Sequence, residues 1–303
     1  MLRGAATRWL GALHTPSDGV AEPQLAAPAI ATAAVRLGAT VMTSCAVRGF
    51  EQSAGRVSAV ITEKGRVACE AAVIAAGAWS SLFCRGYGIV LPQLKVLASV
   101  LRTAAIDGGP LTAAWGPGLA LRKRVDGGYT VAQGTVISDI VPDSFRFLAP
   151  FLPALRMERK GISLKLSRRF FEEWLAARPR ALDVPSSYEE VRVLDPAPVE
   201  RDLAGARATL ERSFPMFKGV PTAERWAGYI DVTPDILPVI SPVEAIPGLF
   251  LSTGFSGHGF GIGPGAGRLT SDLVSGARPI VDPTPFRFSR FTDGSDVRPR
   301  AGL

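Results

Sequence analysis

Cysteine and histidine are scarce in this sequence. Three cysteines (Cys45, Cys69 and Cys84) and two histidines (His14 and His258) occur among 303 residues, and no Cys-x-x-Cys pair is present. An odd, sparse set of cysteines does not build a disulfide framework, and so few Cys and His ligands do not build a zinc-type site. We therefore expect no metal, and a reducing, cytoplasmic setting.

Long apolar runs and blocks of like charge are also absent. No uninterrupted apolar run approaches the ~20 residues that span a bilayer. The arginines behind the net charge of +7 are scattered, without a block of five or six like charges. The sequence thus predicts neither a membrane span nor a nucleic-acid-binding arm. The positive charge suits a small anionic ligand or a phosphate-bearing cofactor, and equally a bias of composition.

What the chain does have is a glycine-dense stretch near its end, residues 248–267. It starts as a short apolar strand, turns, and enters a helix that is expected to end at Gly276. Glycine lets a backbone approach a flat group closely and adopt positive φ. A helix N-terminus adds free N–H groups and the positive end of the helix dipole. The stretch therefore suits an anion or a cofactor that becomes anionic; the alternative is a tight turn with incidental glycines.

The first hundred residues read as mixed α/β structure. A helix is expected over 25–37, a strand over 39–42, and an antiparallel meander over 46–51, 56–62 and 66–69. Residues 71–77 form a wholly apolar run that ends in glycine. Such a run is typical of a strand buried on both faces of a parallel sheet.

From Pro92 onward, strands and helices alternate less regularly. Strands are expected over 94–102, 118–124, 128–134, 224–231 and 237–240, with a hairpin turn at Asp126-Gly127-Gly128. Helices are expected over 143–155, 167–177 and 199–214. The stripe of Phe170, Phe171 and Trp174 on the second of these favours ordinary core packing. The layout is an α/β (α+β) domain at both ends of the chain, interrupted by an antiparallel, β-rich insertion.

Four blocks of this sequence occur together in an order and spacing that are specific in combination: residues 18–23, 56–80, 226–240 and 254–261. Together they resemble the D-amino acid oxidase and glycine/sarcosine oxidase superfamily of FAD-dependent amine oxidoreductases, over about residues 12–290. The resemblance implies a Rossmann-like FAD-binding domain made of residues 12–92 plus 240–290. It also implies a substrate-binding domain over 93–239.

The resemblance assigns cofactor-binding roles by position. The residue whose backbone meets the adenine corresponds to Val47. The strand end that closes on the dinucleotide corresponds to Ala75, Ala76 and Gly77, with Trp79 just beyond. The loop against the isoalloxazine ring corresponds to Gly254, Phe255, Ser256, Gly257, His258, Gly259, Phe260, Gly261 and Ile262. Reduced flavin carries negative charge, which N–H groups at a helix start stabilise.

Two residues are candidates for catalysis. His258 would hydrogen-bond the flavin or polarise the substrate; the alternative is a histidine that satisfies loop backbone groups. Amino-acid-oxidising members of the superfamily often carry an arginine after Trp-x-Gly that grips the substrate carboxylate. Here residues 228–233 contain none, and the Asp-x-Thr-Pro-Asp pattern is closer to sarcosine- and opine-oxidising members. Arg122 is the candidate instead; its alternative is a solvent-exposed strand arginine beside Lys123 and Arg124.

The sequence departs from the superfamily at its start. The superfamily begins with a strand, a Gly-x-Gly-x-x-Gly turn and a helix that bind the FAD pyrophosphate. No such spacing occurs here, and no βα unit precedes Leu25. We therefore expect the FAD-binding domain to lack its first βαβ unit. Two hypotheses follow: a longer protein whose start has been removed, or a diverged protein that binds FAD poorly or not at all.

The sequence predicts an FAD-dependent oxidoreductase that oxidises the C–N bond of a small amino acid or secondary amine. Hydride would pass from substrate to flavin, and the final electron acceptor stays open between oxygen and another molecule. The alternative is a non-catalytic truncated fragment, or an interaction subunit that does not hold FAD by itself. The expected partners are a small amino acid or amine as substrate and, in the alternative, a partner subunit.

Overall fold

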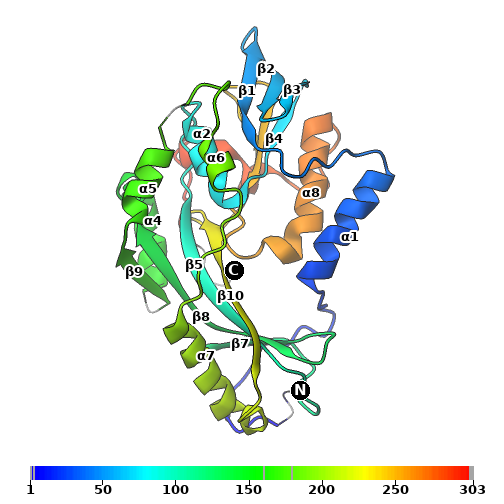
Figure 1. Ribbon diagram of the computed structural model, residues 1–303, viewed down its shortest axis with the longest axis vertical. Coiled ribbons are helices and arrows are strands. Elements are labelled where there is room, and N and C mark those ends of the chain that lie inside the picture. Colours follow the sequence, from blue (N-terminus) through cyan, green and yellow to red (C-terminus); the bar gives the residue numbers. More distant parts are fainter. Residues whose placement is uncertain (1, 3, 160, 179, 300–303) are drawn as a thin grey trace. The chain divides into compact units, whose positions relative to one another are not determined.

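The computed structural model describes residues 2, 4–159, 161–178 and 180–299. The chain divides into two compact units. Unit 1 comprises Met1–Met42, Leu97–Val136 and Asp195–Gly228, and unit 2 comprises Thr43–Val96, Ile137–Leu194 and Tyr229–Leu303. Both units combine helices with β-sheet (Figure 1), as the predicted α/β (α+β) class requires.

Unit 1 is built on part of a six-stranded sheet that contains the strand order β10-β5-β8-β7-β6. Its strands are β5 (Leu94–Thr103), β6 (Ala114–Gly116), β7 (Leu119–Lys123), β8 (Tyr129–Ile140) and β10 (Thr222–Val232). The residues of β5, β8 and β10 are divided between the two units. Strands β6, β7 and β8 pair antiparallel. The predicted turn between β7 and β8 is confirmed: Gly127 has φ +83°, which favours glycine.

The core of unit 1 lies under helix α7 (Glu200–Ser213). Leu203, Ala206 and Leu210 recur at helical spacing and bury one face of α7 against sheet residues such as Leu121 and Val131. The 3-10 turn η2 (Pro215–Phe217) adds Phe217 to the same core. Helix α1 (Pro23–Arg36) also belongs to this unit and has no buried residue.

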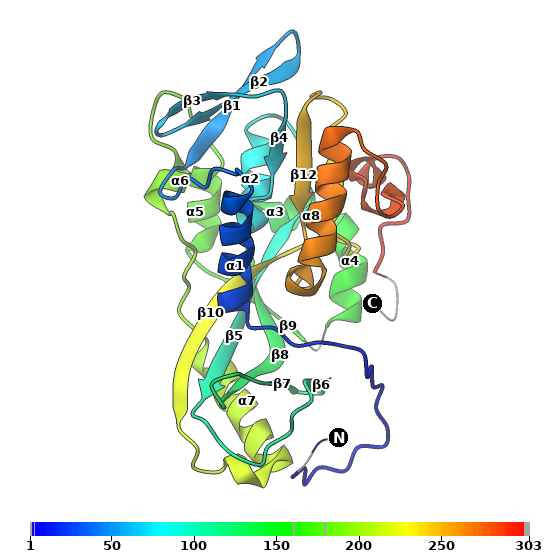
Figure 2. The ribbon, with the colours of Figure 1, turned by 90° about the vertical axis from the view of Figure 1, so that its right-hand side faces the viewer.

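Unit 2 contains two three-stranded sheets. Strands β1 (Val47–Ser53), β2 (Arg56–Thr62) and β3 (Gly65–Ala68) form the predicted antiparallel meander. The second sheet has the order β11-β12-β4, with β11 (Val239–Pro242), β12 (Leu249–Thr253) and β4 (Ala72–Ile74). Strand β12 pairs antiparallel with β11 and parallel with β4. Helix α8 (Gly259–Ser275) lies alongside β12 (Figure 2). Its Ala266 and Leu269 pack against Ile240 of this sheet.

Short elements complete unit 2. After β4 come η1 (Gly77–Trp79) and α2 (Ser80–Arg85). Later in the chain lie α3 (Pro142–Arg146), α4 (Leu148–Met157), β9 (Ile162–Leu166), α5 (Arg169–Ala176) and α6 (Ser187–Glu190). Strand β9 pairs with β8. The tail forms η3 (Thr284–Phe286) and η4 (Phe288–Phe291), and a buried ion pair between Arg290 and Asp235 holds it in place, at 2.7 Å.

Four sequence-based expectations are wrong in detail. Residues 39–42 form no strand, because no neighbouring strand pairs with them. The expected strand 71–77 shrinks to β4, an edge strand whose Val73 is 40% exposed, so it is not buried on both faces. The expected helix 143–155 is two helices that meet at Phe147. The aromatic stripe on α5 is not core, since Phe171 and Trp174 are more than half exposed.

The predicted domains, 12–92 plus 240–290 for FAD and 93–239 for substrate, are assignments of role and stay predictions. The compact units divide the chain at different residues. Across the described ranges, no helix combines the length and the apolarity that crossing a membrane requires.

Candidate functional site

Parallel pairing of β4 with β12 brings two of the predicted cofactor segments together. Because Leu251 lies opposite Ile74 in this ladder, both strands end at the same edge of the sheet. Residues 75–77 leave one strand there and residues 254–262 leave the other. The hydroxyl oxygen of Thr253, at the end of β12, lies 2.8 Å from Ser80 Oγ and 3.4 Å from the Gly77 carbonyl oxygen. Ligands of open α/β sheets bind at this kind of edge.

The loop that leaves β12 has a backbone that requires glycine. Gly254 and Gly257 have φ of +75° and +89°. A Cβ on Gly254 would also lie 2.6 Å from Thr233 Cγ2, closer than real Cβ atoms come to a carbon. Ser256 adopts φ 51° and is held by its hydrogen bond from the backbone N–H to the Asp231 carbonyl, at 2.9 Å. The loop is therefore a fixed shape and not a flexible linker.

The start of α8 is open toward a ligand. The first N–H groups of any α-helix lack intrahelical partners, and here the N-cap, His258, makes no side-chain hydrogen bond to them. Phe260 and Ile262 are 50% and 44% exposed. A Cβ built on Gly261 or Gly265 meets nothing within 4 Å. Free donors, the positive helix end and a bare glycine face fit a flat ring that becomes anionic, as the isoalloxazine of FAD does.

A half-buried carboxylate, that of Asp231, holds the base of the loop. Asp231 Oδ2 accepts from the Gly254 N–H at 2.7 Å, from Gln93 Nε2 at 2.9 Å and from Thr253 Oγ1 at 3.1 Å. Gln93 is itself fixed, since its Oε1 accepts from the Ser81 N–H at 3.0 Å. Asp231 thus ties together the end of β12, the start of the loop and helix α2.

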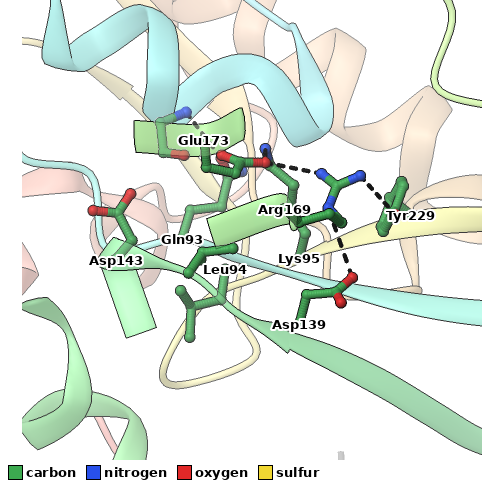
Figure 3. Close-up of a pocket in the computed structure, with 10 residues that line it drawn as sticks. Gln93, Leu94, Lys95, Asp139, Asp143, Arg169, Glu173 and Tyr229 are labelled. Carbon is green, nitrogen blue, oxygen red and sulfur yellow. Dashed lines mark hydrogen bonds and ion pairs between the residues drawn. The ribbon is translucent and has the colours of Figure 1, made fainter. Parts of the chain in front are cut away.

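A charged pocket lies next to this network in the same unit (Figure 3). We define it by Lys95, Asp139, Arg169, Glu173 and Tyr229. Arg169 donates to Glu173 at 2.9 Å and to the Tyr229 hydroxyl at 2.7 Å, and its guanidinium lies 4.3 Å from the centre of the Tyr229 ring. Lys95 Nζ contacts the same Glu173 oxygen at 2.5 Å. The Asp139 carboxylate is the more distant partner of Arg169, at 3.6 Å.

Paired charges in this pocket favour the ionised form of Glu173. Burial opposes ionisation of Glu173, yet Lys95 and Arg169 together hold the pKa of Glu173 below its usual value. Burial raises the pKa of Tyr229. The cavity is about 20 Å³, room for about one water molecule. A substrate carboxylate could pair with Arg169 by replacing one of its present partners. Of these partners, Asp139 lies farthest from the guanidinium of Arg169.

The remaining predicted site residues are Val47, Trp79 and Arg122. Val47 begins β1 in the meander sheet and is 39% exposed. Trp79 ends η1 and is half-buried. Arg122 belongs to unit 1, where it donates to both Glu22 oxygens at 3.0 and 3.1 Å and holds the pKa of Glu22 below its usual value. The roles predicted for these residues, and for residues 75–77 and 254–262, stay predictions.

Sequence reasoning missed Asp231, Gln93 and the charged pocket. Asp231 was visible as the first acid of the Asp-x-Thr-Pro-Asp pattern, but its partner Gln93 is 138 positions away. Arg169 and Glu173 stand four apart on α5, the spacing of a helical ion pair, which was the available signal. No cluster of three or more His, Cys, Asp or Glu side chains suited to a metal occurs within the described ranges.

The sequence profile of the FAD dependent oxidoreductase family matches residues 2–273. The chain belongs to this family. Membership implies a flavin cofactor, and the open start of α8 is consistent with one.

Several family members of known name are similar to this chain. A D-amino acid dehydrogenase of Sinorhizobium medicae is 28% identical over 286 residues, which cover 93% of this chain and 55% of that protein. The L-amino acid deaminase of Proteus vulgaris has a solved structure with TM-score 0.88 and 30% identity, covering 96% of this chain and 67% of that one. The L-amino acid deaminase of Proteus myxofaciens in complex with anthranilate gives TM-score 0.84 and 34% identity, over 87% and 59%. The chain therefore spans little more than half the length of the curated relative.

Proposed function

We propose that this protein is an FAD-dependent oxidoreductase that oxidises the C–N bond of an amino acid or a secondary amine. The observation that carries the proposal is the shared edge of β4 and β12. There a loop fixed by Asp231 leads into a helix whose first N–H groups are uncapped and whose glycine face is bare. Family membership supports the same cofactor.

FAD, when bound, accepts a hydride from the carbon next to the substrate nitrogen. The residues of this chain would position the flavin ring and stabilise the negative charge that it gains. The uncapped N–H groups at the start of α8 would face the ring edge that gains negative charge. Gly261 would let the ring approach the helix, and Phe260 and Ile262 would exclude water from it. His258, exposed at the N-cap, would hydrogen-bond the ring or the substrate.

An arginine would hold the substrate carboxylate. The sequence predicts Arg122, whose guanidinium is now paired with Glu22. The charged pocket offers Arg169. Gln93 lines the same pocket and bonds Asp231 at the base of the loop 254–262, which we call the flavin loop. We propose that one of these two arginines fixes the carboxylate in a bidentate manner. The proposed substrates are therefore amines that carry a carboxylate.

The relatives differ in the configuration of their named substrates, D-amino acids in one case and L-amino acids in the others. Anthranilate, named in one related structure, is an aromatic carboxylate. We propose an amino acid with an apolar or aromatic side chain as substrate, and both enantiomers belong in the test. The cytoplasmic location and the partner subunit stay predictions, which cell fractionation and size-exclusion chromatography would check.

The experiment is a titration of the purified protein with FAD, followed by anaerobic addition of single amino acids. We expect saturable FAD binding, seen as quenched flavin fluorescence, and loss of the oxidised flavin band when a substrate is added. A protein that never binds FAD would favour the alternative hypothesis of a non-catalytic fragment or subunit. A protein that binds FAD and is reduced by no amine or amino acid would contradict the proposed reaction.

A further inference from the structure

Unit 2 contains a second, larger cavity of about 230 Å³. Its walls come from β1, from α2 with the turn after it, and from residues 176–178, 180–182 and 186–188. None of its lining residues belongs to the charged pocket or to the loop 254–262. We call it the α2 cavity and define it by Arg48, Phe83, Tyr87, Arg178 and Tyr188.

Three aromatic side chains, Phe83, Tyr87 and Tyr188, line the α2 cavity. The ring centre of Phe83 lies 5.8 Å from that of Tyr87 and 5.9 Å from that of Tyr188. Tyr87 is anchored by stacking on Phe50 at 3.8 Å and by accepting a hydrogen bond from the Phe50 N–H. These rings form a rigid surface against which another ring packs in an offset or edge-to-face manner.

Three arginines, Arg48, Arg178 and Arg180, also line the cavity, and one of them has no carboxylate partner among the described residues. Arg48 is neutralised by a bidentate pair with Glu189, at 2.9 and 3.0 Å. Arg180 is likewise paired with Glu190. Arg178 has no carboxylate partner in the part of the chain that the structure describes, and its guanidinium lies over the Trp174 ring at 4.9 Å. The cavity therefore has an unneutralised positive charge at its wall.

A hydroxyl donor is also unused. Tyr188 makes a ring contact with Phe83, but its hydroxyl forms no hydrogen bond with any described residue. Burial raises the pKa of Tyr188, so the hydroxyl keeps its proton at neutral pH and is available to donate. Tyr188 lines the cavity and its hydroxyl is accessible to solvent, so it can donate to an acceptor that enters the cavity.

We propose that the α2 cavity binds a small aromatic carboxylate. The ring would pack against Phe83 and Tyr188, and the carboxylate would pair with Arg178 and accept from the Tyr188 hydroxyl. The volume suits a single ring with a short acidic group, whereas the charged pocket has room for only one water. This site does not rest on the proposed oxidoreductase function, because it uses neither the flavin loop nor the charged pocket.

The test is a titration with 4-fluorobenzoate followed by ¹⁹F NMR, with 4-fluorobenzamide as the uncharged analogue. We expect saturable binding of the acid and at least about tenfold weaker binding of the amide. Arg178→Gln and Tyr188→Phe should each weaken binding of the acid by about five- to tenfold. Arg168→Gln is the matched control, because Arg168 is an exposed arginine at the start of α5 outside the cavity, and should change nothing.

Three outcomes would overturn the proposal. The first is no saturable binding of the acid up to about 10 mM, the weak limit of specific recognition. The second is equal binding of acid and amide. The third is binding that Arg178→Gln and Tyr188→Phe leave unchanged while Arg169→Gln abolishes it, which would place the probe in the charged pocket. Arg178 is exposed, so its replacement should leave the fold intact, as circular dichroism would check.

Discussion

The flavin loop and the charged pocket both lie in unit 2, and they differ in how complete they are. At the loop, the N-cap His258 leaves helix N–H groups unsatisfied, and Phe260 is half exposed. In the charged pocket, Arg169, Lys95 and Glu173 satisfy one another, and the remaining cavity is about 20 Å³. The N–H groups of the helix start are left to solvent or to a ligand, whereas the charges of the pocket are already paired with one another.

This difference separates two ways of building a site. An open helix start with bare glycines is prepared for a ligand of fixed shape, and the protein around it supplies geometry. A network of paired charges must exchange a partner before it binds anything, so affinity there depends on how weakly that partner is held. In the charged pocket the weakest contact is Arg169 to Asp139, at 3.6 Å.

Of the changes proposed here, Asp231→Ala should have the largest effect on stability and FAD binding. It removes the carboxylate that links Gly254 of the flavin loop to Gln93, which lines the charged pocket. Gly254 N–H and the Gln93 amide would lose their acceptor, at a cost of about 2–3 kcal/mol in the free energy of unfolding. FAD binding should fall with it, since the loop start would move. Urea denaturation and FAD titration measure both. Glu172→Ala, on the exposed face of α5, is the control; a similar loss there would remove the special role of Asp231.

Replacing the two arginines separates the candidates for the substrate carboxylate. For the arginine that grips the carboxylate, change to methionine should raise KM for a carboxylated substrate by about 10- to 100-fold and leave KM for its amide unchanged. The same change at the other arginine should leave the KM for both substrates unchanged. If Arg122→Met and Arg169→Met both leave KM unchanged, neither residue holds the carboxylate.

His258→Ala should lower turnover by about five- to tenfold, the loss of one hydrogen bond to the ring or substrate. FAD content should fall much less, because His258 is exposed and caps α8 with no side-chain bond. Steady-state kinetics beside the flavin absorbance of the same sample gives both numbers. Equal loss of turnover and FAD would indicate a structural role for this histidine.

The charged pocket should make stability depend on pH through Glu173. Its pKa in the folded protein is lowered, so the stability it contributes is present above its usual pKa of 4.5 and is lost as pH falls through the folded value. Lys95→Met removes an attractive partner and should move that loss to higher pH. Unfolding free energies between pH 3 and 7, a range set by the usual carboxyl pKa values, would show it. Identical profiles for wild type and variant would contradict this account of the pocket.

Local chemistry made part of the fold predictable. The Asp126-Gly127-Gly128 turn, the meander and the end of α8 at Gly276 each follow from a few neighbouring residues, and Gly276 indeed has φ 68°. The glycine-dense loop was visible for the same reason. Asp231 was not, because its role depends on Gln93 and Thr253 from other parts of the chain.

The charged pocket was still less predictable. Arg169 and Tyr229 are 60 positions apart, and only the folded chain shows that they meet. The α5 aromatics misled for a related reason: their spacing resembles that of a buried face, but Phe171 and Trp174 remain exposed. Periodicity reports which residues share a face, and it does not report what covers that face.

The most direct test of the flavin site is the change Gly261→Ala measured beside Gly267→Ala. Both glycines lie in α8 with nothing within 4 Å of an added Cβ, so each alanine should stabilise the protein without FAD by about 0.5–1 kcal/mol. If the start of α8 holds the isoalloxazine, only Gly261→Ala should also weaken FAD binding. Equal FAD affinity for both variants and the wild type would contradict the account.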